Sequence, residues 1–361
     1  MAPTFGLPGR SNWVSTVKRS LRTNITVIYT MGFFHSFMVV IPVFVPLLQG
    51  YGLSMAQVLQ TQALFALTVA VLEVPSGYFA DIWGRKRAVV VGSLANGFGF
   101  LLLLSADSFV DFLIYEFLLG VGISLISGAD LALLYDTETL LAERGEGGGA
   151  GASRSLSRLI SIEAGASGIA GIIASLILVW GDMTQLLLLQ AVCGFVPLFL
   201  GLLLLETPRP QLELGHAANA REIMRLLLFG KPVVLWTTLA IVVFGLLSVY
   251  SFWIYQKYWE ISSVPVAWFG YIWAAFALTV SVSARYAGAL EQRIGWHKLL
   301  WIAAALPFVG LLGMALASGW VGVLFGLAIQ VTRGLSLTLF YEALNSRVPG
   351  DFRATVNSLV S

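Results

Sequence analysis

Long apolar stretches separated by short polar segments dominate this sequence. A helix needs about 20 mainly apolar residues to cross the hydrocarbon core of a bilayer. Helices are the expected state because lipid offers no partner to unpaired backbone groups and the chain lacks the alternating pattern of a membrane barrel. The pattern predicts ten spans, at about residues 25–48, 56–80, 88–105, 110–135, 155–180, 184–205, 233–256, 264–289, 297–317 and 319–341. An eleventh begins near Arg353, and we expect spans eleven and twelve to be missing from this sequence.

Composition supports lipid as the surrounding medium. Of the 361 residues, 58% are hydrophobic and 11% are charged, with a mean hydropathy of +0.85, whereas soluble domains carry about 25% charged residues. A net charge of +2 gives nucleic-acid binding no electrostatic support. The single cysteine and the three scattered histidines argue against a disulfide framework or a metal site. We therefore expect an all-α integral membrane protein with no cofactor, no metal and no nucleic-acid partner.

The positions of lysine and arginine predict the orientation of the spans. If the N-terminus is cytoplasmic, all but two of the 21 basic residues fall in segments on the inner side, the exceptions being Lys257 and Arg333. Such a bias is typical of multi-pass membrane proteins. We expect a multi-pass protein of a bacterial-type inner (plasma) membrane with a cytoplasmic N-terminus, whose first 24 residues lack the features of a cleaved signal.

The longest polar insertion, Glu206 to Lys231, follows the sixth predicted span and divides the chain. It starts with prolines and ends in a segment that we expect to form an amphipathic helix on the cytoplasmic surface. The pattern predicts a cytoplasmic tail, a six-helix bundle, a cytoplasmic linker and an incomplete second bundle, at residues 1–24, 25–205, 206–232 and 233–361.

The two halves carry similar short patterns. Gly77 precedes Gly84 by seven residues in the loop after span two, and Gly288 precedes Gly295 by seven residues in the loop after span eight. Two six-span repeats related by an axis along the membrane normal are a known transporter design. We expect two pseudo-symmetric six-helix bundles, of which ten spans and the start of an eleventh are present.

The first of these loops carries glycines and charges in a specific order, namely Gly77, Asp81, Gly84, Arg85, Lys86 and Arg87. The order resembles the signature of the major facilitator superfamily, G-x-x-x-D-x-x-G-R-K/R-x-K/R, except that Ala88 stands where the signature has its last cation. The resemblance implies a transporter fold in which this loop latches the two halves in the outward-facing state. The alternative is that the cations only anchor the turn at the cytoplasmic surface, which we favour for Arg87.

Elementary chemistry suits a latch, but two departures from the family pattern stand out. Glycine at position 77 allows close helix approach, Gly84 allows a tight reversal, and Glu73 lies one helical turn before Gly77, so we include it in the latch.

Glu116, four residues before Gly120, stands where the family's proton antiporters carry an arginine. The proline-containing motif of span five is also missing. Both departures weaken an assignment to the drug–proton antiporters.

Ionisable side chains within spans are costly and usually face a partner or a cavity. We expect Glu163, near the middle of span five, to accept a proton or pair with a cationic group. Arg333, beside Gln330 in span ten, is expected to offer a fixed positive charge to the substrate. Asp130 in span four and His35 in span one are further candidates for proton transfer. For Glu163 and Arg333 the structural alternative is an ion pair or a snorkelling arginine. For Asp130 it is a hydrogen bond to a nearby serine or to the signature loop around Asp81. For His35 it is a histidine that only packs.

Two other patterns concern packing. Small residues recur at helical spacing, as expected for a contact between helices, at Ser167, Gly171 and Ser175. Aromatic residues gather toward the outer end of span seven, and we expect most of them to form an interfacial belt, with one or two lining an apolar path, at Tyr250, Trp253, Tyr255, Tyr258 and Trp259.

These observations favour a secondary active transporter that moves a small molecule by alternating access, coupled to a proton or another ion. Export is favoured because the predicted cavity spans are mostly apolar. The sequence contains no G-x-x-x-x-G-K-[S/T] motif for ATP hydrolysis, and no nucleophile accompanies the one intramembrane histidine, which disfavours an enzyme. The alternative is a receptor-like or assembly membrane protein that keeps the fold without transporting. The residues indicate no oligomeric state.

Overall fold

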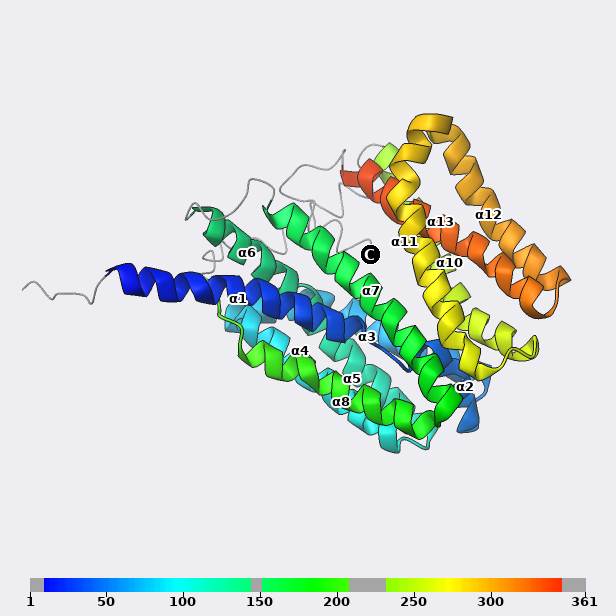
Figure 1. The fold of residues 1–361 in the computed structure, drawn as a ribbon, viewed down its shortest axis with the longest axis horizontal. Helices are drawn as coiled ribbons and strands as arrows, with labels where there is room; N and C mark the ends of the chain where they lie inside the picture. Colours follow the sequence, from blue (N-terminus) through cyan, green and yellow to red (C-terminus); the bar gives the residue numbers. More distant parts are fainter. Residues whose placement is uncertain (1–9, 144–150, 208–231, 346–361) are drawn as a thin grey trace, which may run out of the picture. The chain divides into compact units, whose positions relative to one another are not determined.

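A computed structural model describes residues 10–143, 151–207 and 232–345 (Figure 1). Over these residues the regular structure consists of α-helices and two short 3-10 helices. Most of the linker, including its expected amphipathic helix, and the eleventh apolar stretch lie outside the described residues, as does most of the glycine-rich connector after Glu143. The all-α membrane fold predicted from the apolar pattern is confirmed.

Helices coincide with the ten predicted spans. In the first half they are α1 Arg10–Ser36, η1 Ile41–Val43, α2 Phe44–Gly50, α3 Met55–Trp83, α4 Arg85–Ser105, α5 Phe109–Ser127, α6 Ala129–Glu143, α7 Gly151–Trp180 and α8 Met183–Leu202. In the second half they are α10 Pro232–Ile261, η2 Val266–Trp268, α11 Phe269–Ile294, α12 Trp296–Leu316 and α13 Gly319–Asn345. Nine stretches of the described residues are long and apolar enough to cross a membrane. The tenth predicted span, α13, is not one of them, so the count of ten stays a prediction.

Two spans are broken where the sequence predicted continuous helices. Span one ends as α1 at Ser36 and resumes through η1 and α2, with Pro42 inside the 3-10 turn. Span four is divided into α5 and α6 at Gly128. Helix α1 also begins at Arg10, well before the predicted span, so part of the polar N-terminal segment is helical.

The chain folds as two compact units that do not follow the sequence halves throughout. Unit 1 contains Met1–Met38, Ala56–Ala166 and Thr184–Gln211, and unit 2 contains Val39–Met55, Ser167–Met183 and Leu212–Ser361. Unit 2 thus holds α10 to α13 together with α2 and the end of α7. The predicted domain boundaries stay a prediction.

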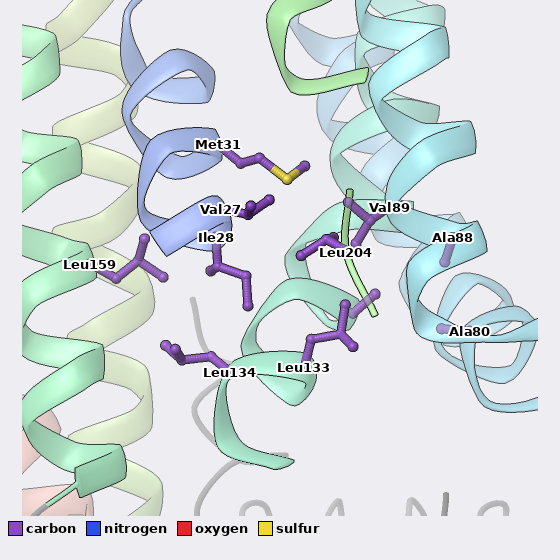
Figure 2. Packing of buried hydrophobic residues seen from close by; sticks show 11 residues of the cluster. Val27, Ile28, Met31, Ala80, Ala88, Val89, Leu133, Leu134, Leu159 and Leu204 are labelled. Carbon is purple, nitrogen blue, oxygen red and sulfur yellow. The ribbon is translucent and has the colours of Figure 1, made fainter. Parts of the chain in front are cut away.

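The core of unit 1 lies where α1, α4, α6 and α7 meet. Figure 2 shows this cluster, which consists of Val27, Ile28, Met31, Ala80, Ala88, Val89, Ala129, Leu133, Leu134, Leu159 and Leu204. Asn24, fully buried at the start of this face, exchanges two hydrogen bonds with the backbone of Leu205. Its Nδ2 donates to the Leu205 carbonyl at 2.9 Å and its Oδ1 accepts from the Leu205 N–H at 2.8 Å. These bonds fix the chain as it leaves α8.

In unit 2 the broken part of span one is held by a side chain of α10. Gln256 is fully buried; its Nε2 donates to the Ile41 carbonyl at 2.9 Å, and its Oε1 accepts from the Val45 N–H at 2.8 Å. Next to it, Lys257 Nζ donates to Gln49 Oε1 at 2.9 Å. One amide therefore supplies an acceptor to the Val45 N–H and a further donor to the Ile41 carbonyl where the helix is interrupted.

The expected contact through small residues of span five is confirmed within unit 2. A Cβ added at Gly171 would lie 2.6 Å from the Gly270 carbonyl oxygen of α11. The flanking serines bond to the same helix, because Ser175 Oγ accepts from the Tyr271 N–H at 3.0 Å and Ser167 Oγ accepts from Trp273 Nε1 at 3.1 Å.

The repeat predicted from the two glycine patterns is visible in the backbone. Gly84 ends α3 and begins α4 with φ 116° and ψ 138°, and Gly295 joins α11 to α12 with φ 84° and ψ 150°. Each glycine N–H donates to a carbonyl four residues earlier, and each glycine carbonyl accepts from an N–H four residues later. A positive φ of this kind favours glycine, so both positions carry the residue that the reversal needs.

Candidate functional sites in the two units

The signature loop of unit 1 is tied to two carboxylates. The Glu206 carboxylate accepts from the backbone N–H groups of Arg85 at 2.9 Å and Lys86 at 3.1 Å, and so caps the start of α4. The Arg85 guanidinium forms an ion pair with Asp136 of α6 and donates to the Ala132 carbonyl at 3.4 Å. Thr207 Oγ1 also donates to Asp136 at 2.8 Å. The loop, α6 and the exit of α8 are thereby joined.

The remaining signature residues are less constrained in the described part of the chain. Lys86 Nζ donates to the Leu202 carbonyl at 2.8 Å, and Arg87 is exposed. A Cβ built at Gly77 would meet no described atom within 4 Å, so the close helix approach expected there is not found. The side chain of Asp81 lies outside the described residues. Glu73 lies on α3, and the Ser76 hydroxyl donates to its carbonyl at 3.0 Å.

Three of the predicted coupling residues belong to unit 1, and we call His35, Asp130 and Glu163 the acid–histidine cluster. A Cβ at Gly32 of α1 would lie 3.3 Å from Glu163 Oε1, so the carboxylate of α7 lies directly over that glycine. His35 is three residues further along α1 and therefore lies on the same side of the helix. Its Nε2 is buried without a hydrogen-bond partner among the described residues.

Asp130 brings a second carboxylate to this cluster. It lies in the first turn of α6, immediately after the break at Gly128, and its Oδ1 accepts from the Leu131 N–H at 2.6 Å. Its charge acts on that of Glu163. Both side chains are carboxyl groups, which carry a proton in their neutral form and only accept hydrogen bonds in their ionised form. The arrangement can therefore bind and release protons.

The other two predicted residues, Gln330 and Arg333, lie in unit 2. Gln330 of α13 is 7% exposed, and the Tyr255 hydroxyl of α10 lies near Gln330, Ser251 and Arg333. We call these four residues the α10–α13 polar group. The Tyr255 hydroxyl is buried without a hydrogen bond among the described residues. Arg333 is exposed and belongs to neither of the ion pairs found there.

Three of the five aromatic residues of span seven are buried, so the belt expected for most of them is wrong. Trp253, Tyr255 and Trp259 are 8%, 2% and 1% exposed. The Tyr255 and Trp259 rings are stacked with centroids 6.2 Å apart, and Phe276 meets both edge-on. Trp259 Nε1 is buried and, within the described residues, has no partner. The expectation that one or two of these rings line an apolar path stays a prediction, and Tyr255 and Trp259 are the candidates.

The described residues contain no group of three or more His, Cys, Asp or Glu that could hold a metal ion. The polar atoms of the two sites are hydroxyl, amide, indole, imidazole, carboxylate and guanidinium groups. They suit proton transfer and hydrogen bonding to a small molecule.

A family comparison decides what kind of protein carries these sites. The model of the Major Facilitator Superfamily matches residues 25–361. The chain belongs to the major facilitator superfamily. It is accordingly a multi-pass membrane transporter, as the signature loop indicated, and not an enzyme. No protein of curated function matches it in sequence.

Solved structures of superfamily transporters share the fold. The nucleoside transporter NupG has a TM-score of 0.71 at 10% identity, covering 94% of this chain and 86% of that one. A D-xylose–proton symporter has a TM-score of 0.68 at 14% identity, covering 94% and 85%. A bacterial homologue of the human lysosomal transporter Spinster, inward-facing and unoccupied, has a TM-score of 0.70 at 16% identity, covering 95% and 78%. Identities this low establish the fold alone.

Several residues of these sites were missed by the sequence analysis. Glu206 is the first acidic residue after the apolar run of α8, a position at which it can reach the neighbouring helix start, and this was the available signal. Asp136 was missed as well; it lies beyond the end of the fourth predicted span, at residues 110–135, and so was not counted among the charges inside spans. Ser251 of the α10–α13 polar group gave no signal, because a serine within a span usually bonds to its own helix.

Proposed function

We propose that this transporter exports a small molecule by alternating access in exchange for protons. The acid–histidine cluster carries the proposal, since Glu163 lies over Gly32 of α1 and interacts with the charge of Asp130, and Nε2 of His35 on α1 is buried without a described partner. A group that binds a proton on one side of the membrane and releases it on the other must exist in a stable neutral form at membrane depth. Two carboxylates and a histidine in an apolar setting meet that condition.

The α10–α13 polar group is proposed to bind the substrate. Arg333 supplies a fixed positive charge, and the Tyr255 hydroxyl supplies an O–H donor. Trp259, whose ring stacks on that of Tyr255, adds an indole N–H donor. Neither donor has a described partner. Aromatic faces surround these donors. Such a set suits a small organic anion with an apolar body, because the charge meets the guanidinium and the body meets the rings.

The signature loop is proposed to act as the conformational latch, through Gly77, Asp81, Gly84, Arg85, Lys86 and Arg87 with Glu73. Support comes from the rigid turn at Gly84 and from the Arg85–Asp136 ion pair, which fix the loop within unit 1. Because these contacts already hold the loop in one conformation, its other side chains can bind a second part of the protein without a further loss of conformational entropy in the loop.

The test uses proteoliposomes of the full chain, loaded with a pH-sensitive dye and exposed in turn to aromatic and aliphatic carboxylates. Proton–substrate exchange predicts uptake against a gradient when the lumen is acidic, and dye alkalinisation as substrate enters. Uptake driven only by an acidic exterior would show symport and contradict export.

Variants assign the coupling. Glu163→Gln keeps the size of the side chain and removes its charge, so substrate counterflow should continue while proton movement is lost. Glu143→Gln, at an exposed position at the end of α6, is the matched control and should behave as wild type. Unchanged proton-driven uptake in Glu163→Gln would remove this residue from the mechanism. Arg333→Gln should abolish counterflow of the anion, and Arg333→Lys should retain part of it.

A further inference from the structure

A carboxylate outside the acid–histidine cluster is buried between α3 and α5. Glu116 of α5 is 3% exposed, and its Oε1 accepts a hydrogen bond from Gln62 Nε2 of α3. The ion pairs found among the described residues are Arg85–Asp136 and Lys257–Glu260, and Glu116 is in neither.

Among the described residues, neither ion pair compensates the charge of Glu116. Tyr115, its neighbour on α5, is buried, and its hydroxyl carries no charge at neutral pH. At the close contacts that glycines make between α5 and the helices α3 and α4, the residues of α3 and α4 are uncharged, namely Phe65 and Thr68 on α3 and Gly92, Asn96 and Gly99 on α4. An ionised carboxylate in such a place loses its hydration and gains one amide hydrogen bond, whereas the neutral acid loses far less.

The partner residue suits the neutral acid. A primary amide has both a donor and an acceptor, and a protonated carboxyl group has both as well. The two groups can form a pair of hydrogen bonds, in which Gln62 Nε2 donates to the carboxyl C=O and the carboxyl O–H donates to the amide oxygen. An ionised Glu116 would leave that amide oxygen facing a negative charge.

From this geometry we infer that Glu116 and Gln62 form a second proton-binding site, separate from the acid–histidine cluster, in which the carboxyl group is held in its protonated form. Helix α3 carries Gln62, and few of its residues from Met55 to Glu73 are buried within the described structure. One turn beyond Glu116, Gly120 packs on Thr68 of α3, where an added Cβ would lie 2.8 Å from the threonine Cβ. A displacement of α3 about this contact separates Gln62 from Glu116 and weakens the hold on the proton.

Infrared difference spectroscopy of the full chain in lipid tests the site without any substrate. At neutral pH, wild type minus Glu116→Gln should show the C=O stretch of a protonated carboxylic acid. Incorporation of ¹³C-glutamate should shift this band, which excludes Asp130 as its source. The band should persist in Glu163→Gln. Carboxylate stretches in place of the acid band would overturn the inference.

A second variant examines the amide partner. Gln62→Leu removes the N–H donor, so the acid C=O stretch should move to higher frequency while the band remains. Gln60→Leu makes the same chemical change at an exposed position of α3 and should leave the band in place. A band unmoved by Gln62→Leu would contradict the proposed pair. The transport assay of Glu163→Gln tests the proposed function, and the infrared band of Glu116 tests the second proton-binding site. Loss of proton-coupled uptake in Glu163→Gln, with the Glu116 band intact, supports both proposals. Each measurement can fail while the other succeeds.

Discussion

Replacing Gln256 by leucine tests how the interrupted part of span one is held. Leucine has a similar volume but no polar atoms, so the change removes two hydrogen bonds without creating a large cavity. The Val45 N–H loses its acceptor at 2.8 Å, and the Ile41 carbonyl loses a donor at 2.9 Å. Both bonds lie in a region where Val45 and Gln256 are fully buried, so water does not replace the amide.

The two losses differ in size. The Val45 N–H lies in the first turn of α2, where a helix has no internal acceptor, and a buried donor left unsatisfied costs about 1–3 kcal/mol. The Ile41 carbonyl keeps the Phe44 N–H as a partner, so its loss is that of an ordinary hydrogen bond, about 0.5–1.5 kcal/mol. Together these terms lower the free energy of unfolding by about 2–4 kcal/mol.

The free energy of unfolding can be measured by titrating the full chain with SDS in mixed micelles and following tryptophan fluorescence. Gln292→Leu makes the same chemical change at an exposed position of α11 and should stay within about 0.5 kcal/mol of wild type. If Gln256→Leu destabilises the protein no more than this control does, the amide does not hold the broken segment.

Three further predictions use paired positions in the same helices or loop. Gly84→Ala places a side chain at φ 116° and should lower the unfolding free energy by about 1–3 kcal/mol in the same SDS titration, whereas Gly77→Ala, with no described atom near its Cβ, should be neutral or slightly stabilising. Gly171→Ala should cost about 1–3 kcal/mol because its Cβ meets a carbonyl oxygen of α11, and equal melting temperatures for it and Gly168→Ala would refute the contact. Glu206→Gln should cost about 0.5–1 kcal/mol and speed hydrogen exchange of the first amides of α4; unchanged exchange would show that the cap is not formed.

Apolar patterning predicted where helices occur but not where they break. A run of apolar residues such as 25–48 has the same composition whether its backbone is continuous or interrupted. The break after Ser36 is stabilised by Gln256, which lies in the other half of the sequence, so no local pattern records it. The break at Gly128 contains a glycine, but many glycines of this chain lie within unbroken helices. Tertiary contacts decide between these cases.

The candidate sites were predictable to different degrees. An ionisable residue inside an apolar run is conspicuous, which is why Glu163, Asp130 and His35 were found from the sequence. The contact of Glu163 with Gly32 of α1 and its interaction with Asp130 depend on how α1, α6 and α7 pack, and the spacing along the chain does not encode this. Aromatic residues at a helix end suit either a belt or a packed core, and the burial of Tyr255 and Trp259 depended on α11 and α13.

The glutamine that completes the interrupted helix also affects how the protein is made. Gln256 lies 211 residues after Val45 in the chain. At a synthesis rate of about 5–20 residues per second, the ribosome adds Gln256 about 10–40 s after Val45. During that interval the Val45 N–H must be satisfied by water or by the insertion machinery, because lipid offers no acceptor. The first span is therefore expected to settle into its final depth only after the seventh has been inserted.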